Sequence, residues 1–319
     1  MTLLKINYNI NYVLVVVLFF TLSCKNAKSN TENGPEPQKD EVSEETDETQ
    51  DRIGGFLVDK PYNNDTIDFS NVSVTISDDM NVVGFPRKME TYGTLFAGMK
   101  AVPDEFLNEV AETFHQMFPQ DAGLDLKKQH ELLNTMLQYR SVIPVLEGRY
   151  ESASEDINEG LEKLSNEYSV CDIIMYKDGT GRQTMEVIEH LLHYVTSIGL
   201  HLTAPEAWSF TDPKSEVTVA MNKAIDLGLY NIDGYEDILE EAKEVHQRVI
   251  VQEFAYWLIS TYWDLQEPYG PMEEEEWNID NKSQLLEKLP EGYHLVENTV
   301  AKYMSAPSKE ILEKFRKYN

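Results

Sequence analysis

One stretch of the sequence constrains the fold more than any other, because it cannot lie on a surface. Residues 249–259 read Val-Ile-Val-Gln-Glu-Phe-Ala-Tyr-Trp-Leu-Ile, so apolar side chains would point in every direction around a helix. Such a helix must be covered on all sides by other elements. Its polar exceptions are Gln252 and Glu253, and a buried carboxylate is costly unless it is paired or coordinated. We therefore predict a buried helix in which Glu253 meets a histidine or another cation, a metal, or an Arg or Tyr partner.

The pattern of the chain changes from strands to helices along its length. Residues 69–77 and part of 80–96 alternate polar and apolar side chains between Gly and Pro residues, which is typical of strands and turns. Further helices are expected at 103–118, 126–139, after Ser154, and at 182–198, 215–227, 237–266 and 309–318, with short apolar runs at 141–146 and 170–175. The order predicts an α+β globular domain over 53–319, with an N-terminal mixed α/β lobe and a mostly helical C-terminal lobe.

The helix expected at 182–198 gathers ionisable side chains on one side. Its apolar residues share one broad arc: Val187, Ile188, Leu191, Leu192, Val195 and Ile198. The opposite arc has two carboxylates, two imidazoles and a serine: Glu186, Glu189, His190, His193 and Ser197. Glu189 and His193 are four residues apart, and His190 and His193 are three apart, so either pair can converge on one metal ion. The alternative is a solvated polar face without a ligand.

Strand, turn, a helix with Glu189-His190-Leu-Leu-His193, and then a buried helix with Glu253 form a pattern that resembles the zincin metallopeptidases. The resemblance is to the gluzincin type, in which a downstream glutamate is the third zinc ligand, and it spans residues 170–260. His193 matches the second histidine of His-Glu-x-x-His, and Glu253 matches the downstream glutamate. Glu189 replaces the first histidine, and His190 replaces the general-base glutamate. The resemblance implies a zincin-like fold.

The same resemblance implies a function and a cofactor. Zinc would be held by Glu189, His193 and Glu253, with His190 as the general base or a fourth ligand, because a glutamate can bind zinc through oxygen and a histidine can act as a base. The implied activity is that of a zinc-dependent hydrolase, and a peptide or protein would be its ligand. The alternative is a binding or scaffold module of the cell envelope with the same fold and no metal.

The N-terminus resembles a bacterial lipoprotein signal. The apolar run at 13–22 is about ten residues long, which suits the h-region of a signal peptide and is too short to span a bilayer. It ends in Thr21-Leu-Ser-Cys24, which resembles a lipobox and implies a signal peptide over 1–23 and a lipid on Cys24. An ordinary signal peptide with an incidental cysteine is the alternative. Residues 24–52 are polar and acidic without an aromatic residue, and this composition predicts a disordered tether.

Charge and cysteine content limit the partners and the site chemistry. The chain has 27 Lys and Arg against 56 Asp and Glu, a formal net charge of −29, so it lacks the basic footprint that nucleic acids require. Two cysteines exclude a disulfide framework, and Cys171 lies in an apolar context that predicts a buried, inert thiol. The lipoprotein resemblance described above implies a protein of the bacterial cell envelope, anchored to the outer membrane through its lipid, on the periplasmic or surface face.

Overall fold

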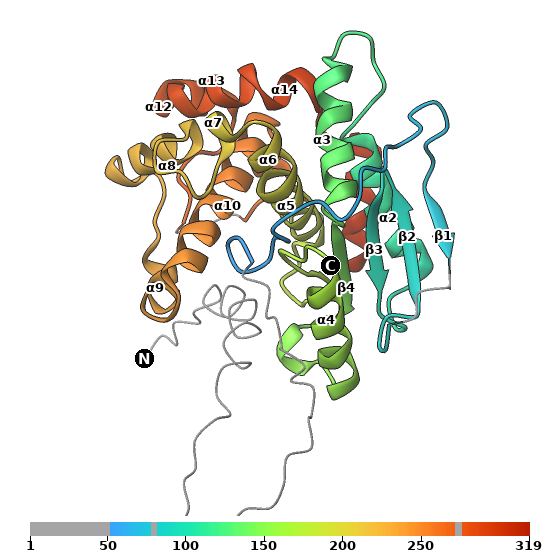
Figure 1. Cartoon of the computed structure of the whole chain (residues 1–319). Coiled ribbons are helices and arrows are strands. Elements are labelled where there is room, and N and C mark those ends of the chain that lie inside the picture. Colours follow the sequence, from blue (N-terminus) through green and yellow to red (C-terminus); the bar gives the residue numbers. More distant parts are fainter. Residues whose placement is uncertain (1–51, 78–81, 272–275) are drawn as a thin grey trace, which may run out of the picture.

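The computed structural model describes residues 52–77, 82–271 and 276–319 (Figure 1). The predicted signal peptide, the lipidation site Cys24 and all of the predicted tether except Arg52 lie outside the described residues. Arg52 donates hydrogen bonds to the carbonyls of Asn166 and Tyr168. In the described part of the chain, no helix has the length and apolar character needed to cross a membrane.

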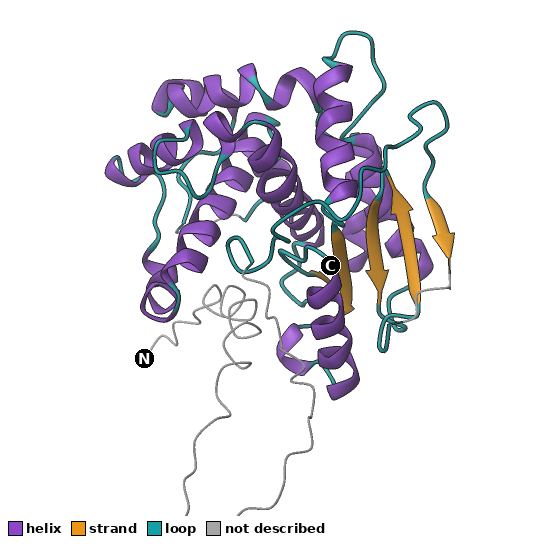
Figure 2. Ribbon diagram, in the orientation of Figure 1, coloured by secondary structure: helices purple, strands orange, loops and turns teal. Residues whose placement is uncertain are grey.

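A five-stranded mixed sheet forms the N-terminal lobe (Figure 2). Its strands lie in chain order: β1 (Thr75–Ser77), β2 (Arg87–Thr91), β3 (Thr94–Gly98), β4 (Val142–Glu147) and β5 (Ile174–Tyr176). The first three strands are antiparallel, and β3, β4 and β5 are parallel. Parallel strands need long crossovers. These are provided by α2 (Asp104–Gln116) and α3 (Leu126–Gln138) between β3 and β4, and by α4 (Glu155–Glu167) between β4 and β5.

Both faces of the central strands are covered. Ile143 and Val145 of β4 belong to the main core, which also includes residues of α2, α3 and the C-terminal helices. Val142 and Leu146 point to the other face, where they join a smaller cluster with α4. The almost uninterrupted apolar run at 141–146 follows from this burial on two sides.

The C-terminal lobe is helical and is built around α10 (Lys243–Tyr262). The other elements are α5 (Gln183–Tyr194), the π-helix η3 (Val195–Leu200), α6 (His201–Thr203), α7 (Pro205–Trp208), α8 (Glu216–Asp226), the 3₁₀ turn η4 (Asp233–Tyr235), α9 (Glu236–Glu241), α11 (Gln266–Tyr269), α12 (Lys282–Lys288), α13 (Pro290–Asn298), α14 (Val300–Tyr303), α15 (Lys309–Lys314) and the 3₁₀ turn η5 (Phe315–Tyr318). All residues from Val249 to Thr261 are buried, so the prediction of a helix covered on every side is confirmed. The mixed α/β lobe and the helical lobe are likewise confirmed.

Three predicted elements differ from those observed. The long helix at 237–266 is broken at Ala242, whose ψ of 88° separates α9 from α10. The helix at 182–198 continues beyond Tyr194 as a π-helix, where the Thr196 hydroxyl donates to the carbonyls of Leu192 and His193 and competes with regular helical bonds. The strand at 69–77 is reduced to β1, because Asp68 accepts hydrogen bonds from Ser70 and forms a turn.

Candidate metal centre

Three elements bring four ionisable side chains together in the interior. Asp172 lies just before β5, His190 and His193 lie on α5, and Glu253 lies on α10. Helices α5 and α10 pack against each other (Figure 1). The His193 side chain is 1% exposed, that of Glu253 11% and that of Asp172 14%. The predicted alternative of a solvated polar face on α5 is therefore wrong.

His193 is the centre of this cluster. Its Nδ1 lies 2.7 Å from Asp172 Oδ2, to which it donates a hydrogen bond. Its Nε2 lies 3.4 Å from Glu253 Oε2, but the approach lacks hydrogen-bond geometry, so Nε2 is a buried nitrogen without a hydrogen-bond partner. One potential ligand atom from each of Asp172, His193 and Glu253 lies within 4.8 Å of the others. The structure thus brings together His193 and Glu253, two of the three predicted ligands.

His190 lies on the other side of Asp172. Its Nδ1 is 2.6 Å from the carbonyl of Glu186, and its Nε2 is 3.4 Å from Asp172 Oδ1. Both ring nitrogens therefore face oxygen atoms of the protein. In this arrangement His190 helps to hold Asp172, whereas the predicted general base or fourth ligand would need a nitrogen directed toward Glu253.

Glu189, the third predicted ligand, is half-buried on α5 and does not belong to the compact group of three. Burial first, and then the negative charge of Glu253, raise the pKa of Glu189 to about 8. The two carboxylates are therefore close enough to repel each other. A cation placed between them would remove this repulsion.

The cluster shifts the pKa values of its members in opposite directions. Burial by itself lowers the pKa of His193, but Glu253 and Asp172 outweigh it and raise that pKa to about 9. Burial by itself raises the pKa of Asp172, but the charges and hydrogen bonds of His190 and His193 hold it well below its usual range. The group is an ion network in which Asp172 is anionic and is held by two imidazoles.

A second layer of side chains supports Asp172, and the sequence did not predict it. Gln252 donates from Nε2 to Asp172 Oδ2 over 3.3 Å, and Arg248 donates to Gln252 Oε1 over 2.7 Å. Arg248 also donates to the carbonyl of Cys171. Asp172 could have been found as the lone acid in the apolar run 170–175, which is the same signal that drew attention to Glu253.

Cys171 precedes this aspartate but takes no chemical part. It is fully buried, and burial raises the pKa of its thiol well above the ordinary value. A thiol of this kind is a poor nucleophile and a poor metal ligand. The prediction of a buried thiol is confirmed.

No protein-family model, curated protein or solved structure matches this chain. The zincin-like resemblance therefore stays a prediction, which depends on the residues of α5 and α10.

Proposed function

We propose that this chain is a zinc-binding lipoprotein of the bacterial cell envelope, in which His193, Glu253 and Glu189 hold the metal. The observation that carries the proposal is the Nε2 atom of His193, which is buried, directed at the Glu253 carboxylate and without a hydrogen bond. A buried polar atom is costly unless it finds a partner. Imidazole nitrogen and carboxylate oxygen are ordinary zinc ligands, so these residues fit the metal.

Asp172 is assigned an orienting role in this proposal. Metal-binding histidines commonly donate their other ring N–H to a carboxylate, which fixes the tautomer and leaves the second nitrogen free to bind. Asp172 Oδ2 is already occupied by His193 and Gln252, and Oδ1 faces His190. Asp172 therefore holds His193 in position, and His190 and Gln252 hold Asp172.

Hydrolysis is the activity that we assign to this site, in line with the resemblance to zincins. Bound zinc supplies a Lewis acid and lowers the pKa of a coordinated water. The chain's own contribution is to fix His193 through Asp172 with Nε2 directed at Glu253, and to limit solvent around Glu253, whose side chain is 11% exposed. In the described residues near His193, Ser197 donates its hydroxyl to Gln252 and Cys171 is inert, so neither favours a nucleophilic mechanism.

A second candidate is the binding or scaffold module without metal. It is favoured by the raised pKa of His193, about 9, because an imidazolium between Asp172 and Glu253 interacts favourably with both carboxylates without any bound ion. The two candidates differ in the protonation of one atom. Zinc requires His193 to lose a proton, whereas the metal-free network keeps it.

Metal analysis of the full chain, purified without a chelator or a metal-affinity tag, tests the proposal. We expect one zinc per chain, lost in His193→Ala and Glu253→Gln and retained in His294→Ala, whose histidine side chain is 56% exposed. Calorimetry in two buffers of different ionisation enthalpy should show proton release on zinc binding, because His193 and Glu189 bind zinc only when deprotonated. Wild-type protein that takes up no zinc and releases no proton would establish the metal-free module.

The proposed anchor has its own test. The lipid on Cys24 should be detected by metabolic labelling with a fatty acid, and the labelled protein should sediment with membranes. Cys24→Ser should abolish both the label and the sedimentation, because one thiol carries the diacylglycerol. Cys171→Ser is the matched control, since this thiol is buried in the fold and should not affect labelling. A Cys24→Ser protein that still labels contradicts the lipoprotein assignment.

A further inference from the structure

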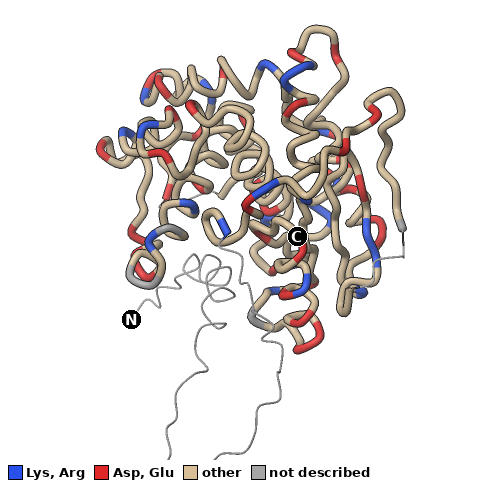
Figure 3. The backbone as a smooth tube through the Cα atoms, viewed as in Figure 1, with Lys and Arg blue, Asp and Glu red and all other residues tan. Residues whose placement is uncertain are grey.

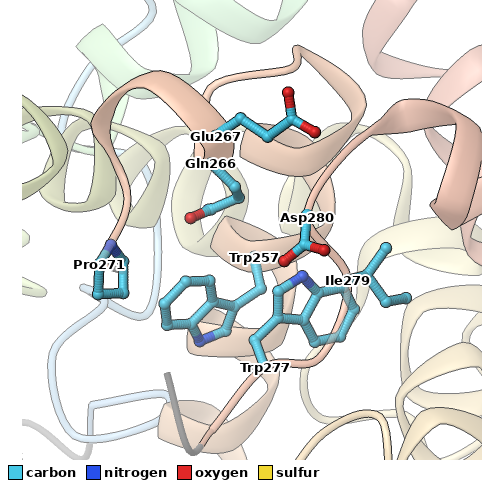
Figure 4. A pocket seen from close by; sticks show the side chains of 7 residues that line it. All are labelled: Trp257, Gln266, Glu267, Pro271, Trp277, Ile279 and Asp280. Atoms are coloured by element: carbon cyan, nitrogen blue, oxygen red, sulfur yellow. The ribbon is translucent and has the colours of Figure 1, made fainter. Parts of the chain in front are cut away.

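A pocket of about 280 Å³ lies beside the C-terminal half of α10 (Figure 4). Its lining consists of Trp257, Gln266, Glu267, Pro271, Trp277, Ile279 and Asp280. The two indoles and Ile279 are buried and form an apolar floor, whereas Glu267 and Asp280 are exposed. Trp257 follows Glu253 by one helical turn, about 6 Å along the axis. The pocket is therefore a neighbour of the metal centre and shares none of its residues.

Each side-chain nitrogen that lines the pocket already donates a hydrogen bond within the protein. Trp257 Nε1 donates to Glu276 over 2.9 Å, and Trp277 Nε1 donates to Thr261 over 2.9 Å. Gln266 Nε2 donates to Ser260 over 2.7 Å. A ligand in this pocket thus meets acceptors and aromatic surface. An anion would need donors that are bound elsewhere.

Within the described residues, a side-chain amide donates a hydrogen bond to each of the two carboxylates at the rim. Asn281 donates to Glu267 Oε1 over 2.7 Å, and Gln284 donates to Asp280 Oδ2 over 2.9 Å. Each carboxylate keeps a second oxygen with lone pairs for a ligand. No Lys or Arg belongs to the lining described by the structure.

The lysines that follow the pocket in the chain are engaged elsewhere. Lys282 Nζ lies 3.7 Å from the centroid of the Tyr262 ring, and Lys288 Nζ donates to the carbonyl of Asn278. Lys and Arg are scattered among the acids over the described chain rather than gathered at one place (Figure 3). The negative charge of the rim is therefore available to a cation from outside the chain.

We infer that this pocket binds a lysine or arginine side chain of a partner polypeptide. The alkyl stem packs on the indoles of Trp257 and Trp277, and the cationic head binds between Glu267 and Asp280. A small concave site with an apolar floor and two polar groups that fix orientation has the composition expected of a specific binding pocket. This binding is a separate activity and does not require zinc.

The test follows the indole N–H signals of the ¹⁵N-labelled full chain in two-dimensional NMR. The chain has four tryptophans, so Trp208 and Trp263, outside the pocket, are internal controls. Nα-acetyl-lysinamide and Nα-acetyl-argininamide should shift the Trp257 and Trp277 signals. Nα-acetyl-norleucinamide and Nα-acetyl-citrullinamide, which have similar shapes without the charge, should bind about tenfold more weakly or not at all.

Variants test whether the two rim carboxylates bind the ligand. Glu267→Gln with Asp280→Asn keeps the acceptor oxygens for Asn281 and Gln284 but removes the charge, and should weaken lysinamide binding about tenfold. Glu159→Gln, an exposed position on α4, is the matched control and should change nothing. Zinc content should be unaffected by the rim variants, so failure here is distinct from failure of the metal site.

Three results would overturn the inference. These are neutral amides that bind as well as the charged ones, shifts of all four indoles together, or full affinity in the rim double variant. Binding of n-butylamine without binding of the acetylated amino acid amides would also contradict it, because the ligand would then be a free amine.

Discussion

Two regions of this molecule bury glutamates on helices, and they do so in opposite ways. Glu109 on α2 has a side chain only 6% exposed, and its two carboxylate oxygens accept from Lys317 Nζ at 2.8 Å and from Tyr318 OH at 2.9 Å. Glu253 on α10 is almost as buried, but His193 Nε2, which lies 3.4 Å from its Oε2, makes no hydrogen bond with it. The chain thus supplies hydrogen bonds to the Glu109 carboxylate, whereas the contact between Glu253 and His193 lacks one. We call these the complete and the incomplete cluster.

The charge of the two clusters differs in the same sense. Lys317 serves two glutamates, Glu105 and Glu109, and one of these lies largely in solvent. The cluster between α5 and α10 holds four carboxylates against two imidazoles: Asp172, Glu186, Glu189 and Glu253 against His190 and His193. Structural pairing explains the first cluster completely. In the second, burial and the charge of Glu253 raise the pKa of Glu189 to about 8, and a bound cation would favour its ionised form.

The largest effect that would separate the two clusters is stabilisation by zinc. A ligand that binds only the folded state stabilises it by about 4 kcal/mol when its free concentration is 1,000 times the dissociation constant. We therefore expect saturating zinc to raise the melting temperature and a chelator to reverse the increase, with His193→Ala insensitive to both. Glu109→Gln should respond to zinc as the wild type does. A melting temperature that ignores zinc and chelator in the wild type would make the two clusters equivalent.

The second effect concerns the complete cluster, in which Glu109 contacts Lys317 and Tyr318. Glu109→Gln should lower the free energy of unfolding by about 1.5–3 kcal/mol, because hydrogen bonds to a buried charged group are lost or weakened. Glu105→Gln is the matched control: it removes the other carboxylate on the same lysine, but Glu105 has a side chain 69% exposed, so we expect less than about 1 kcal/mol. Urea unfolding of both variants measures the difference. Equal losses would show that burial does not decide the strength of these contacts.

The helix at the centre of the site could be predicted because its signal is local. The uniform apolarity of residues 249–259 predicts burial of α10, and the burial of Glu253 follows from its place in that helix. To predict that His193 faces Glu253, one further assumption was needed, namely that α5 and α10 are neighbours. That assumption was natural, because Glu253 needs a partner and the ionisable arc of α5 offers histidines.

The rest of the site depends on contacts that no local pattern contains. Asp172 reaches His193 because the chain enters β5 beside α5, and that placement is set by the parallel pairing of β4 and β5. Arg248 lies one residue before the apolar run and is 1% exposed. Its Cζ lies 5.1 Å from the centroid of the Phe56 ring, which belongs to the first described segment. Arg248 is therefore buried by a residue that is distant in the sequence, and its neighbours in the sequence do not predict this burial.

The smallest effect tests whether Glu189 belongs to the incomplete cluster, and it has a defined sign. The folded pKa of Glu189 is about 8, above its ordinary value of 4.5, because of burial and of the charge of Glu253. Between these two pH values the unfolded chain binds fewer protons than the folded one, so metal-free protein loses stability as the pH rises from 4.5 to 8.

Glu189→Gln should remove this contribution and gain about 1–2 kcal/mol relative to the wild type near pH 8, after allowance for solvent screening at a half-buried side chain. The gain should disappear as the pH falls below 4.5, where the wild-type carboxyl becomes protonated in both states. Chemical unfolding of both proteins in chelator across this range measures it. Zinc should reverse the order, since the wild type then gains a ligand that the variant lacks. A variant that is no more stable than the wild type at pH 8 would place Glu189 outside the cluster, which would then rest on the contact between His193 and Glu253.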